Sequence, residues 1–211
     1  MLKSVCNACC AKGLLISFCF PIHIQSMMKN IGACKLTWVT LDSPLGKIHV
    51  SGCEEGVHDI SIQAVKGLTE GAKMEPFTCT VWEGQEMMSD QLQICTDWLR
   101  AYFNELQVVE KLPMPCFHHP LLQEDSFTSR VLHILLRDIK MGEMVSYKRL
   151  AEMAGNAKAV RAVGGAMRRN PVPLLIPCHR VISSSGQIGN YMGGQGNHVK
   201  QWLLAHEKAN M

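Results

Sequence analysis

The sequence lacks a long hydrophobic run. No stretch of its 211 residues approaches the roughly 20 consecutive apolar residues that a membrane-spanning helix needs, which excludes such a helix. A convincing cluster of basic residues for nuclear import is also missing, and the net charge is only +3. Scattered basic residues usually form a solvated surface, so the charge is compatible with a nucleic-acid partner without indicating one.

The cysteine spacing of a secreted, disulfide-linked domain is absent too. The ten cysteines show no such framework, and free cysteines are ordinary in a reducing compartment. Several of them crowd into residues 1–33 beside an apolar run. That run ends at Pro21 without a clear cleavage site, which argues against a signal peptide. The pair Cys6-x-x-Cys9 has no second pair at metal-ligand spacing. Residues 1–33 are therefore predicted to be an extension of unknown role.

Apolar residues make up 47% of the chain and charged residues 18%, which is typical of a globular protein with a buried core. From Thr37 to Ile62, apolar and polar residues alternate between turn signals, and this pattern predicts an antiparallel meander. Residues 63–88 are polar and irregular, as expected of a surface loop. Residues 89–103 carry apolar side chains at helical spacing and predict a helix that packs into the core.

Residues 112–120 form a proline-rich connection, so we expect a domain boundary near residue 119. The predicted fold class is α/β (α+β). Residues 34–118 form a small N-terminal sheet-plus-helix domain. Residues 119–211 form a mainly helical C-terminal domain with a winged-helix-like helix-turn-helix, and its first helix begins at a cap, Asp125 or Ser126, and ends at Gly142.

The helix-turn-helix is predicted from two short helical segments on either side of Gly155. Residues 146–155 form the first helix, and the second begins at Ala157 and ends near Arg169. Basic side chains on the second helix suit phosphates of DNA. Its many small residues leave two interpretations open, which are close helix packing and a slim face that fits a narrow groove.

Residues 170–181 bring a cysteine to the end of an apolar run. Pro177 removes a backbone donor, so regular strand pairing should fail there. Cys178 follows at once, and then come His179 and Arg180, whose positive charge would favour a thiolate over a thiol. A lone cysteine beside Leu-Leu-Ile is usually a small core residue. The Pro-Cys-His-Arg string disfavours this alternative without excluding it.

This stretch closely resembles the active-site signature of the O6-alkylguanine-DNA alkyltransferases, the methylated-DNA–protein-cysteine methyltransferases, in their vertebrate form. The similarity continues through residues 161–168, 189–194 and 202–207, and it covers about residues 34 to 207. The resemblance implies a DNA-repair enzyme that moves an alkyl (methyl) group from O6 of guanine to its own cysteine, irreversibly and once per molecule. It also implies double-stranded DNA with O6-alkylguanine as the partner, a monomer, and a nuclear location.

The resemblance assigns a role to each part of the catalytic site. Cys178 is the acceptor, His179 is linked to it through a water, and Glu207 orients the histidine, in the manner of a nucleophile, a base and a third group. Asn170 supports the active-site turn. Arg161 replaces the guanine in the base stack, because a base inside a duplex must be flipped out to react.

The resemblance also assigns DNA contacts and a guanine pocket. The DNA contacts are Thr128, Tyr147, Lys148, Asn156, Arg161 and Ser184. The pocket residues are Tyr147, Val181, Tyr191 and Met192. Two residues depart from the family pattern. Met192 stands where serine is common, which leaves the accepted substrate size open, and Lys148 replaces a frequent glutamine, which adds charge for a phosphate.

Two thiolates and two imidazoles are available for a tetrahedral zinc site. They come from Cys34, Cys53, His58 and one of the adjacent His118 and His119. The spacing is not that of a zinc finger, so the residues alone leave the question open. The resemblance selects His118 and implies a structural Zn²⁺.

Two other functions stay open from the sequence. One is an alkylguanine-recognising DNA-binding protein without transfer activity, but such relatives lack the cysteine, so Cys178 argues against it. The other is a DNA-binding regulator that uses only the helix-turn-helix and zinc. That function leaves the Pro-Cys-His-Arg string unexplained.

Overall fold

The computed structural model of the chain describes residues 34–64, 78–81, 88–194 and 196–209. The predicted N-terminal extension, residues 1–33, lies outside these ranges. The chain divides into two units, Met1–Lys35 and Leu36–Met211. All the described helices and strands belong to the second unit, and the mixture of sheet and helix confirms the predicted fold class.

The first part of this unit is an antiparallel sheet in the order β3-β2-β1-β4. Its strands are β1 (Thr37–Ser43), β2 (Gly46–Cys53), β3 (Gly56–Ala64) and β4 (Thr78–Val81). The predicted meander is confirmed by the pairing of β1 with β2 and of β2 with β3. Alternating side chains enter the core, and Val39, Leu41, Ile48 and Val50 are fully buried, as expected of a sheet covered on one face.

The prediction that residues 63–88 form only a loop is wrong at two places. Strand β3 continues to Ala64, and β4 pairs with β1 through residues 78–81. The β-branched residues Thr78, Thr80 and Val81 are suited to a strand. By pairing there, β4 satisfies backbone groups of β1 that would otherwise be an open sheet edge.

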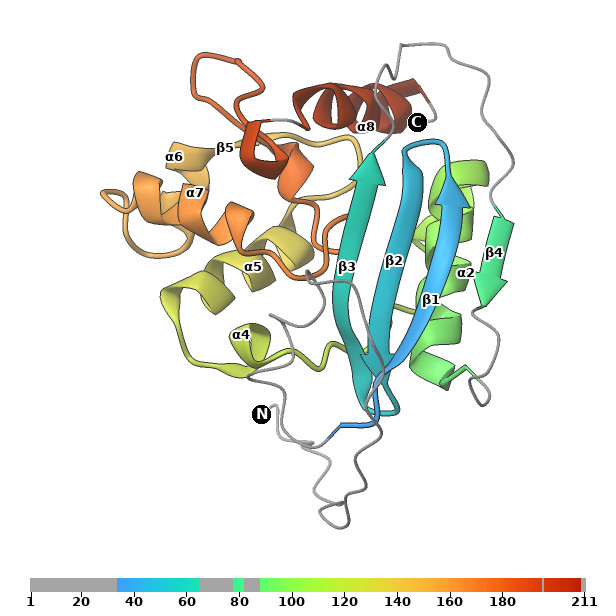
Figure 1. Cartoon of the computed structure of the whole chain (residues 1–211). Helices are drawn as coiled ribbons and strands as arrows, with labels where there is room; N and C mark the ends of the chain where they lie inside the picture. Colours follow the sequence, from blue (N-terminus) through green and yellow to red (C-terminus); the bar gives the residue numbers. More distant parts are fainter. Residues whose placement is uncertain (1–33, 65–77, 82–87, 195, 210–211) are drawn as a thin grey trace. The chain divides into compact units, whose positions relative to one another are not determined.

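Helix α2 (Asp90–Asn104) packs across one face of the sheet (Figure 1). The predicted start is confirmed, because the Ser89 side chain caps the helix by accepting a hydrogen bond from the backbone N–H of Leu92. The buried positions recur every three or four residues and include Trp98 and Tyr102. A short helix, α3 (Leu106–Val109), follows.

Most of the remaining elements lie beyond the β3 side of the sheet, and the C-terminal helix lies above the ends of β2 and β3 in the view of Figure 1. The helices are α4 (Pro120–Gln123), α5 (Phe127–Asp138), α6 (Tyr147–Met153), α7 (Val160–Arg168) and α8 (Asn197–Ala209), with short 3-10 helices η2 (Cys178–Arg180) and η3 (Met192–Gly194). Two short strands, β5 (Val145–Ser146) and β6 (Val181–Ile182), pair in parallel. None of the helices in the described part of the chain is long and apolar enough to cross a membrane.

Two predicted helix boundaries are corrected. Helix α5 ends at Asp138 rather than at Gly142, because Ile139 is already extended. Helix α7 begins at Val160 rather than at residue 157. Asn156 forms a turn there, since its side-chain oxygen accepts the N–H of Lys158 and its carbonyl accepts the N–H of residue 159.

The predicted domain boundary near residue 119 falls inside the second unit and stays a prediction. The connection before it is tied to β3, because Val57 pairs with Phe117 and exchanges backbone hydrogen bonds with Cys116 and His118. Gly56 lies directly against this connection. A side chain there would place its Cβ 2.6 Å from the carbonyl oxygen of Cys116.

We therefore expect Gly56→Ala to lower the free energy of unfolding by about 2 kcal/mol, because a backbone atom cannot yield as a flexible side chain would. Gly164→Ala is the control, since a Cβ there meets nothing within 4 Å and alanine favours a helix by up to about 1 kcal/mol. Urea unfolding of both variants measures the difference. Equal stability of the two variants would contradict this account of the connection.

Candidate active site and metal cluster

The turn that carries Cys178 is held by Asn170. The Asn170 side-chain amide donates to the carbonyl of Ile176 at 2.8 Å, and its oxygen accepts the N–H of Val172 at 3.1 Å. Leu174, within this turn, has a φ of 75°, which is costly for a residue other than glycine. Asn170 thus bridges both ends of a tight turn that local preferences alone would not form.

Cys178 begins η2 and is only 5% exposed. Its Sγ lies 4.0 Å from the hydroxyl of Tyr191. Burial raises the pKa of the Cys178 thiol, while hydrogen bonds from Asn170 and Tyr191 and the charge of Lys200 oppose the rise. The expectation that the next two residues in sequence would favour the thiolate is therefore wrong, because their side chains are directed to Glu207.

His179 is fully buried and neutral. Its Nε2 lies 2.7 Å from Oε1 of Glu207. Burial lowers the pKa of His179, and the neighbouring carboxylate opposes this only in part. The ring proton therefore sits on Nε2, where it is donated to Glu207. The other nitrogen, Nδ1, is buried and finds no hydrogen-bond partner among the described residues. Nδ1 is thus a bare acceptor, as a general base requires.

The Glu207 carboxylate joins this histidine to a buried ion pair. Arg180 donates from Nε to Oε2 and from Nη2 to Oε1, both at 2.9 Å, and the N–H of Gly142 donates at 3.2 Å. Burial pushes the pKa of Glu207 upward, but the hydrogen bonds from His179 and Arg180 and the charge of Arg180 outweigh it and hold that pKa well below its usual range. Glu207 is therefore ionised, and its charge is paired with Arg180.

Lys200 is the cation that acts on Cys178, and sequence reasoning missed it. It is fully buried in α8, and its Nζ donates to the carbonyl of Val181 at 2.6 Å and lies 5.9 Å from the ring centroid of Tyr147. Burial lowers the pKa of Lys200 to about 8, although Cys178 opposes the shift. A signal was present, because Lys200 and Glu207 are seven residues apart and share one helix face.

Two of the residues predicted to line the guanine pocket, Tyr191 and Tyr147, are linked to Cys178 in the structure. Tyr191 is buried beside the sulfur. Burial, and then the charge of Cys178, raise the pKa of the half-buried Tyr147. The Val181 carbonyl is engaged by the lysine described above. Met192 has a φ of 47° and is 44% exposed. A Cβ at Gly196 would lie 2.8 Å from the Met192 Cβ, so glycine at 196 makes room for the methionine.

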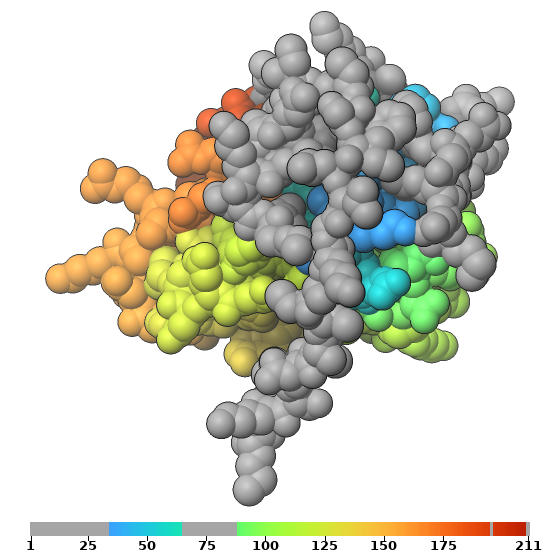
Figure 2. Space-filling view, turned by 60° about the horizontal axis from the view of Figure 1, so that its bottom comes forward, coloured from blue at the N-terminus to red at the C-terminus, as the bar shows by residue number. Residues whose placement is uncertain are grey.

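Of the six predicted DNA contacts, four are exposed, Tyr147 is half-buried and one is buried. The exposed residues are Lys148, Asn156, Arg161 and Ser184. Thr128 is buried, and its hydroxyl accepts a hydrogen bond from Arg169 at 2.6 Å. In Figure 2 the orange segment, which includes α6 and α7, projects from one side of the molecule. The DNA role of Thr128 stays a prediction, since its described contact is internal.

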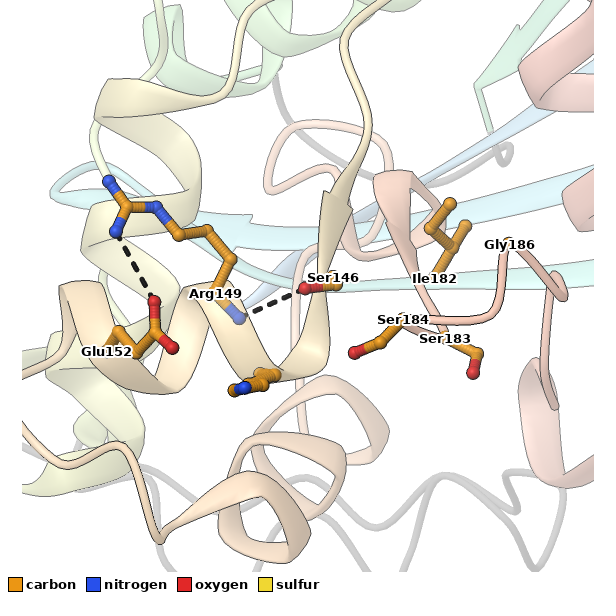
Figure 3. A pocket seen from close by; sticks show the side chains of 8 residues that line it. Ser146, Arg149, Glu152, Ile182, Ser183, Ser184 and Gly186 are labelled. Atoms are coloured by element: carbon orange, nitrogen blue, oxygen red, sulfur yellow. Dashed lines mark hydrogen bonds and ion pairs between the residues drawn. The ribbon is translucent and has the colours of Figure 1, made fainter.

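A surface pocket of about 420 Å³ brings Lys148 and Ser184 together. One wall is the start of α6 and the other is the turn that follows β6 (Figure 3). Arg149 is directed toward Glu152 at 3.4 Å, and its backbone N–H donates to the Ser146 hydroxyl at 3.0 Å (Figure 3). Lys148 and the hydroxyls on the other wall are therefore suited to a phosphate.

A second cluster, composed of Cys53, His58 and His118, could hold a metal ion. The Cys53 Sγ lies 3.2 Å from Nε2 of His58 and 3.2 Å from Nδ1 of His118. Zinc bonds of ~2.3 Å to sulfur and ~2.0 Å to nitrogen place tetrahedral ligands about 3.5 Å apart, which fits these separations. Burial, and then the charges of His118 and His119, lower the pKa of His58 to about 4, so the imidazole is neutral as a ligand must be.

His119 and Cys34 are the other two candidates for the zinc site. His119 caps α4, because its Nδ1 accepts the N–H of Leu121 at 3.1 Å, so it is used outside the cluster. Cys34 belongs to the unit Met1–Lys35, and its place as fourth ligand stays a prediction.

We expect Lys200→Met to slow the reaction of Cys178 with iodoacetamide roughly tenfold at pH 7, because loss of the cation raises the pKa of the thiol and leaves less thiolate. Lys200 carries its charge below pH 8 and loses it above, so the difference should shrink by pH 9.5. Lys208→Met, an exposed position on the same helix, is the control. Peptide mass spectrometry measures the rate, and a pH-independent difference would refute the electrostatic role.

Two family models match the chain. They are the 6-O-methylguanine DNA methyltransferase ribonuclease-like domain, over residues 36–116, and the DNA binding domain of the same enzyme, over residues 126–209. The methylated-DNA–protein-cysteine methyltransferase of Rattus norvegicus is 56% identical over 174 residues, covering 82% of this chain and 83% of that protein. That of Homo sapiens is 53% identical over 175 residues, covering 82% and 81%.

Solved structures agree with the sequence comparison. The crystal structure of Mycobacterium tuberculosis OGT in complex with DNA is 28% identical, with a TM-score of 0.60, and covers 81% of this chain and 92% of that chain. Three observations lead to one conclusion. They are the Cys-His-Glu arrangement, the two matching family models, and the identity of 53% and 56% to the two methyltransferases over most of the chain. The chain belongs to the 6-O-methylguanine DNA methyltransferase family.

Proposed function

We propose that this protein repairs DNA by moving an alkyl group from O6 of guanine to Cys178. The observation that carries the proposal is the buried cysteine followed by a neutral His179 whose Nε2 is held by Glu207 at 2.7 Å. This arrangement supplies a nucleophile, a proton acceptor and an orienting carboxylate. A lesion-recognition protein without transfer activity has no use for these three groups.

The reaction is a displacement at the alkyl carbon. The sulfur forms a bond to that carbon while the bond from carbon to O6 breaks, and its electron pair remains with the guanine. The thiol proton passes to Nδ1 of His179, through a water as the family resemblance implies, and the departing guanine takes up a proton. The product is a thioether, which water does not cleave, so each molecule reacts once.

The DNA-facing part of the proposal rests on α7. A Cβ added at Gly164 or at Gly165 would meet nothing within 4 Å, so close packing within the protein does not require these glycines. This observation favours a slim face that enters a groove of DNA. Arg161, exposed at the start of the same helix, would replace the flipped guanine in the base stack, and Lys148 would neutralise a phosphate.

We also infer that Cys53, His58 and His118 bind a structural Zn²⁺ with Cys34 as the fourth ligand. Two thiolates and two imidazoles form a closed tetrahedral site with no open position for substrate. The metal would therefore stabilise the fold and take no part in the transfer.

The working location and assembly are part of the same proposal. One chain carries the acceptor cysteine, its proton acceptor and the DNA-binding helices, so a monomer suffices. We infer a nuclear location, because the proposed substrate is chromosomal DNA. Imaging of a fluorescent fusion tests the location, and light scattering of the purified chain tests the monomer.

The intact mass of the protein, measured after incubation with a duplex that carries one O6-methylguanine, tests the transfer. We expect the wild type to gain one methyl group per chain, located in the peptide with Cys178. Cys178→Ala should gain none while it still binds the duplex. Cys116→Ser, a change at an exposed cysteine, should react as the wild type does. A methyl gain by Cys178→Ala would show that another group is the acceptor.

Metal analysis of the purified protein tests the zinc site. We expect about one zinc per chain, and loss of zinc together with a lower melting temperature in Cys53→Ser. Cys116→Ser changes a neighbouring exposed thiol and should keep both the metal and the stability. Full zinc content in Cys53→Ser would remove this cysteine from the ligand set.

A further inference from the structure

We propose that Tyr102 is a positioning residue for alkyl transfer: its hydroxyl fixes the Glu207 carboxylate that orients His179, so α2 completes the active site. The inference rests on the proposed function. Tyr102 belongs to the sheet-packing helix, 105 residues before Glu207 in the chain. The catalytic residues named above, Asn170, Cys178, His179 and Glu207, all lie in the second half of the chain.

The hydroxyl reaches the same oxygen that holds the histidine. Tyr102 Oη donates to Oε1 of Glu207 at 2.8 Å, and Nε2 of His179 lies 2.7 Å from that oxygen. Both side chains are fully buried. A hydrogen bond to a charged group in such surroundings is stronger than one between neutral groups. The direction of the carboxylate, and with it the direction of the imidazole, therefore depends on a donor from α2.

A second contact ties the two helices at the same point. The residue before Glu207, His206, donates from Nε2 to the backbone carbonyl of Tyr102 at 2.7 Å. The His206 ring stacks on Trp202 at 4.9 Å, and the Tyr102 ring stacks on Trp98 at 5.4 Å. Two consecutive residues of α8 are thus held by one residue of α2. Tyr102 has little freedom to leave Glu207 by a shift of either helix.

The charge around Glu207 is set by a small number of groups. The titratable or charged neighbours are Tyr102 from α2, His179 and Arg180 from η2, Lys200 and His206 from α8, and Tyr191 from the segment before η3. Within this set, the Tyr102 hydroxyl donates a hydrogen bond to Oε1 of Glu207 and so reduces the negative charge that this oxygen presents to His179. Without it, Glu207 would stabilise a protonated imidazole more strongly, and the pKa of His179 would rise. Protonated His179 cannot accept the thiol proton.

The experiment compares full-length wild type, Tyr102→Phe and Trp98→Phe. Phenylalanine keeps the buried ring at position 102 and removes only the hydroxyl. Trp98→Phe disturbs the packing around that ring and leaves the hydroxyl in place, which makes it the matched control. Single-turnover transfer from O6-benzylguanine is measured as a function of pH, and thermal unfolding confirms that each variant is folded.

We expect Tyr102→Phe to slow transfer roughly tenfold at pH 7, the effect of one hydrogen bond to a charged group. The acid limb of the pH profile should move to higher pH. Trp98→Phe should leave the position of that limb unchanged. In a Glu207→Gln background, Tyr102→Phe should have little further effect, because two residues that act as one unit are not additive.

Three results would overturn the proposal: an unshifted acid limb in Tyr102→Phe, full additivity with Glu207→Gln, or loss of folding in Tyr102→Phe. Loss of folding would mean that the hydroxyl supports the fold itself. Absence of transfer by the wild type would instead refute the proposed function. The rate of Cys178 modification by iodoacetamide, measured in the same variants, would still show whether Tyr102 and Glu207 act together.

Discussion

One buried carboxylate, that of Glu207, constrains the arrangement of the second unit. A carboxylate taken out of water costs several kcal/mol unless it gains partners. Here the partners come from places far apart in the chain: Tyr102 on α2, Gly142 after α5, and His179 and Arg180 on η2. Each donor has to arrive at the same carboxylate, so these elements can pack in few other ways.

The same constraint decides the chemistry of the cysteine. Arg180 is committed to Glu207 and to the carbonyl of Ile139, so it does not act on Cys178 although it is two residues away. His179 is committed through Nε2, which leaves Nδ1 as a base. The charge that favours a thiolate comes instead from Lys200, which lies on α8 and not on the segment that carries the cysteine. The thiol is therefore buried and mostly protonated, with a base and a cation arranged around it.

The surface proposed to contact DNA is under a different constraint. Its residues, such as Lys148 and Arg161, are exposed, and the glycines of α7 face open space. Nothing in the packing of the described residues requires these residue types, which agrees with the proposed contact with DNA. Gly56 is the contrast, because the backbone of Cys116 leaves it no room for a side chain.

Much of the local structure was determined by the sequence alone. Alternation predicted the meander, and Ser126 was one of two residues considered as the cap of α5, because capping needs only a few neighbouring residues. The Pro-Cys-His-Arg string predicted Cys178 as the nucleophile through its resemblance to a family. The end of α5, the start of α7 and strand β4 were missed. The two helix boundaries are set by turns, and β4 exists because it pairs with the edge of β1. Only the tertiary structure decided that Lys200 and Tyr102 reach the active site, because buried charges choose partners by distance in space, which the order of residues does not reveal.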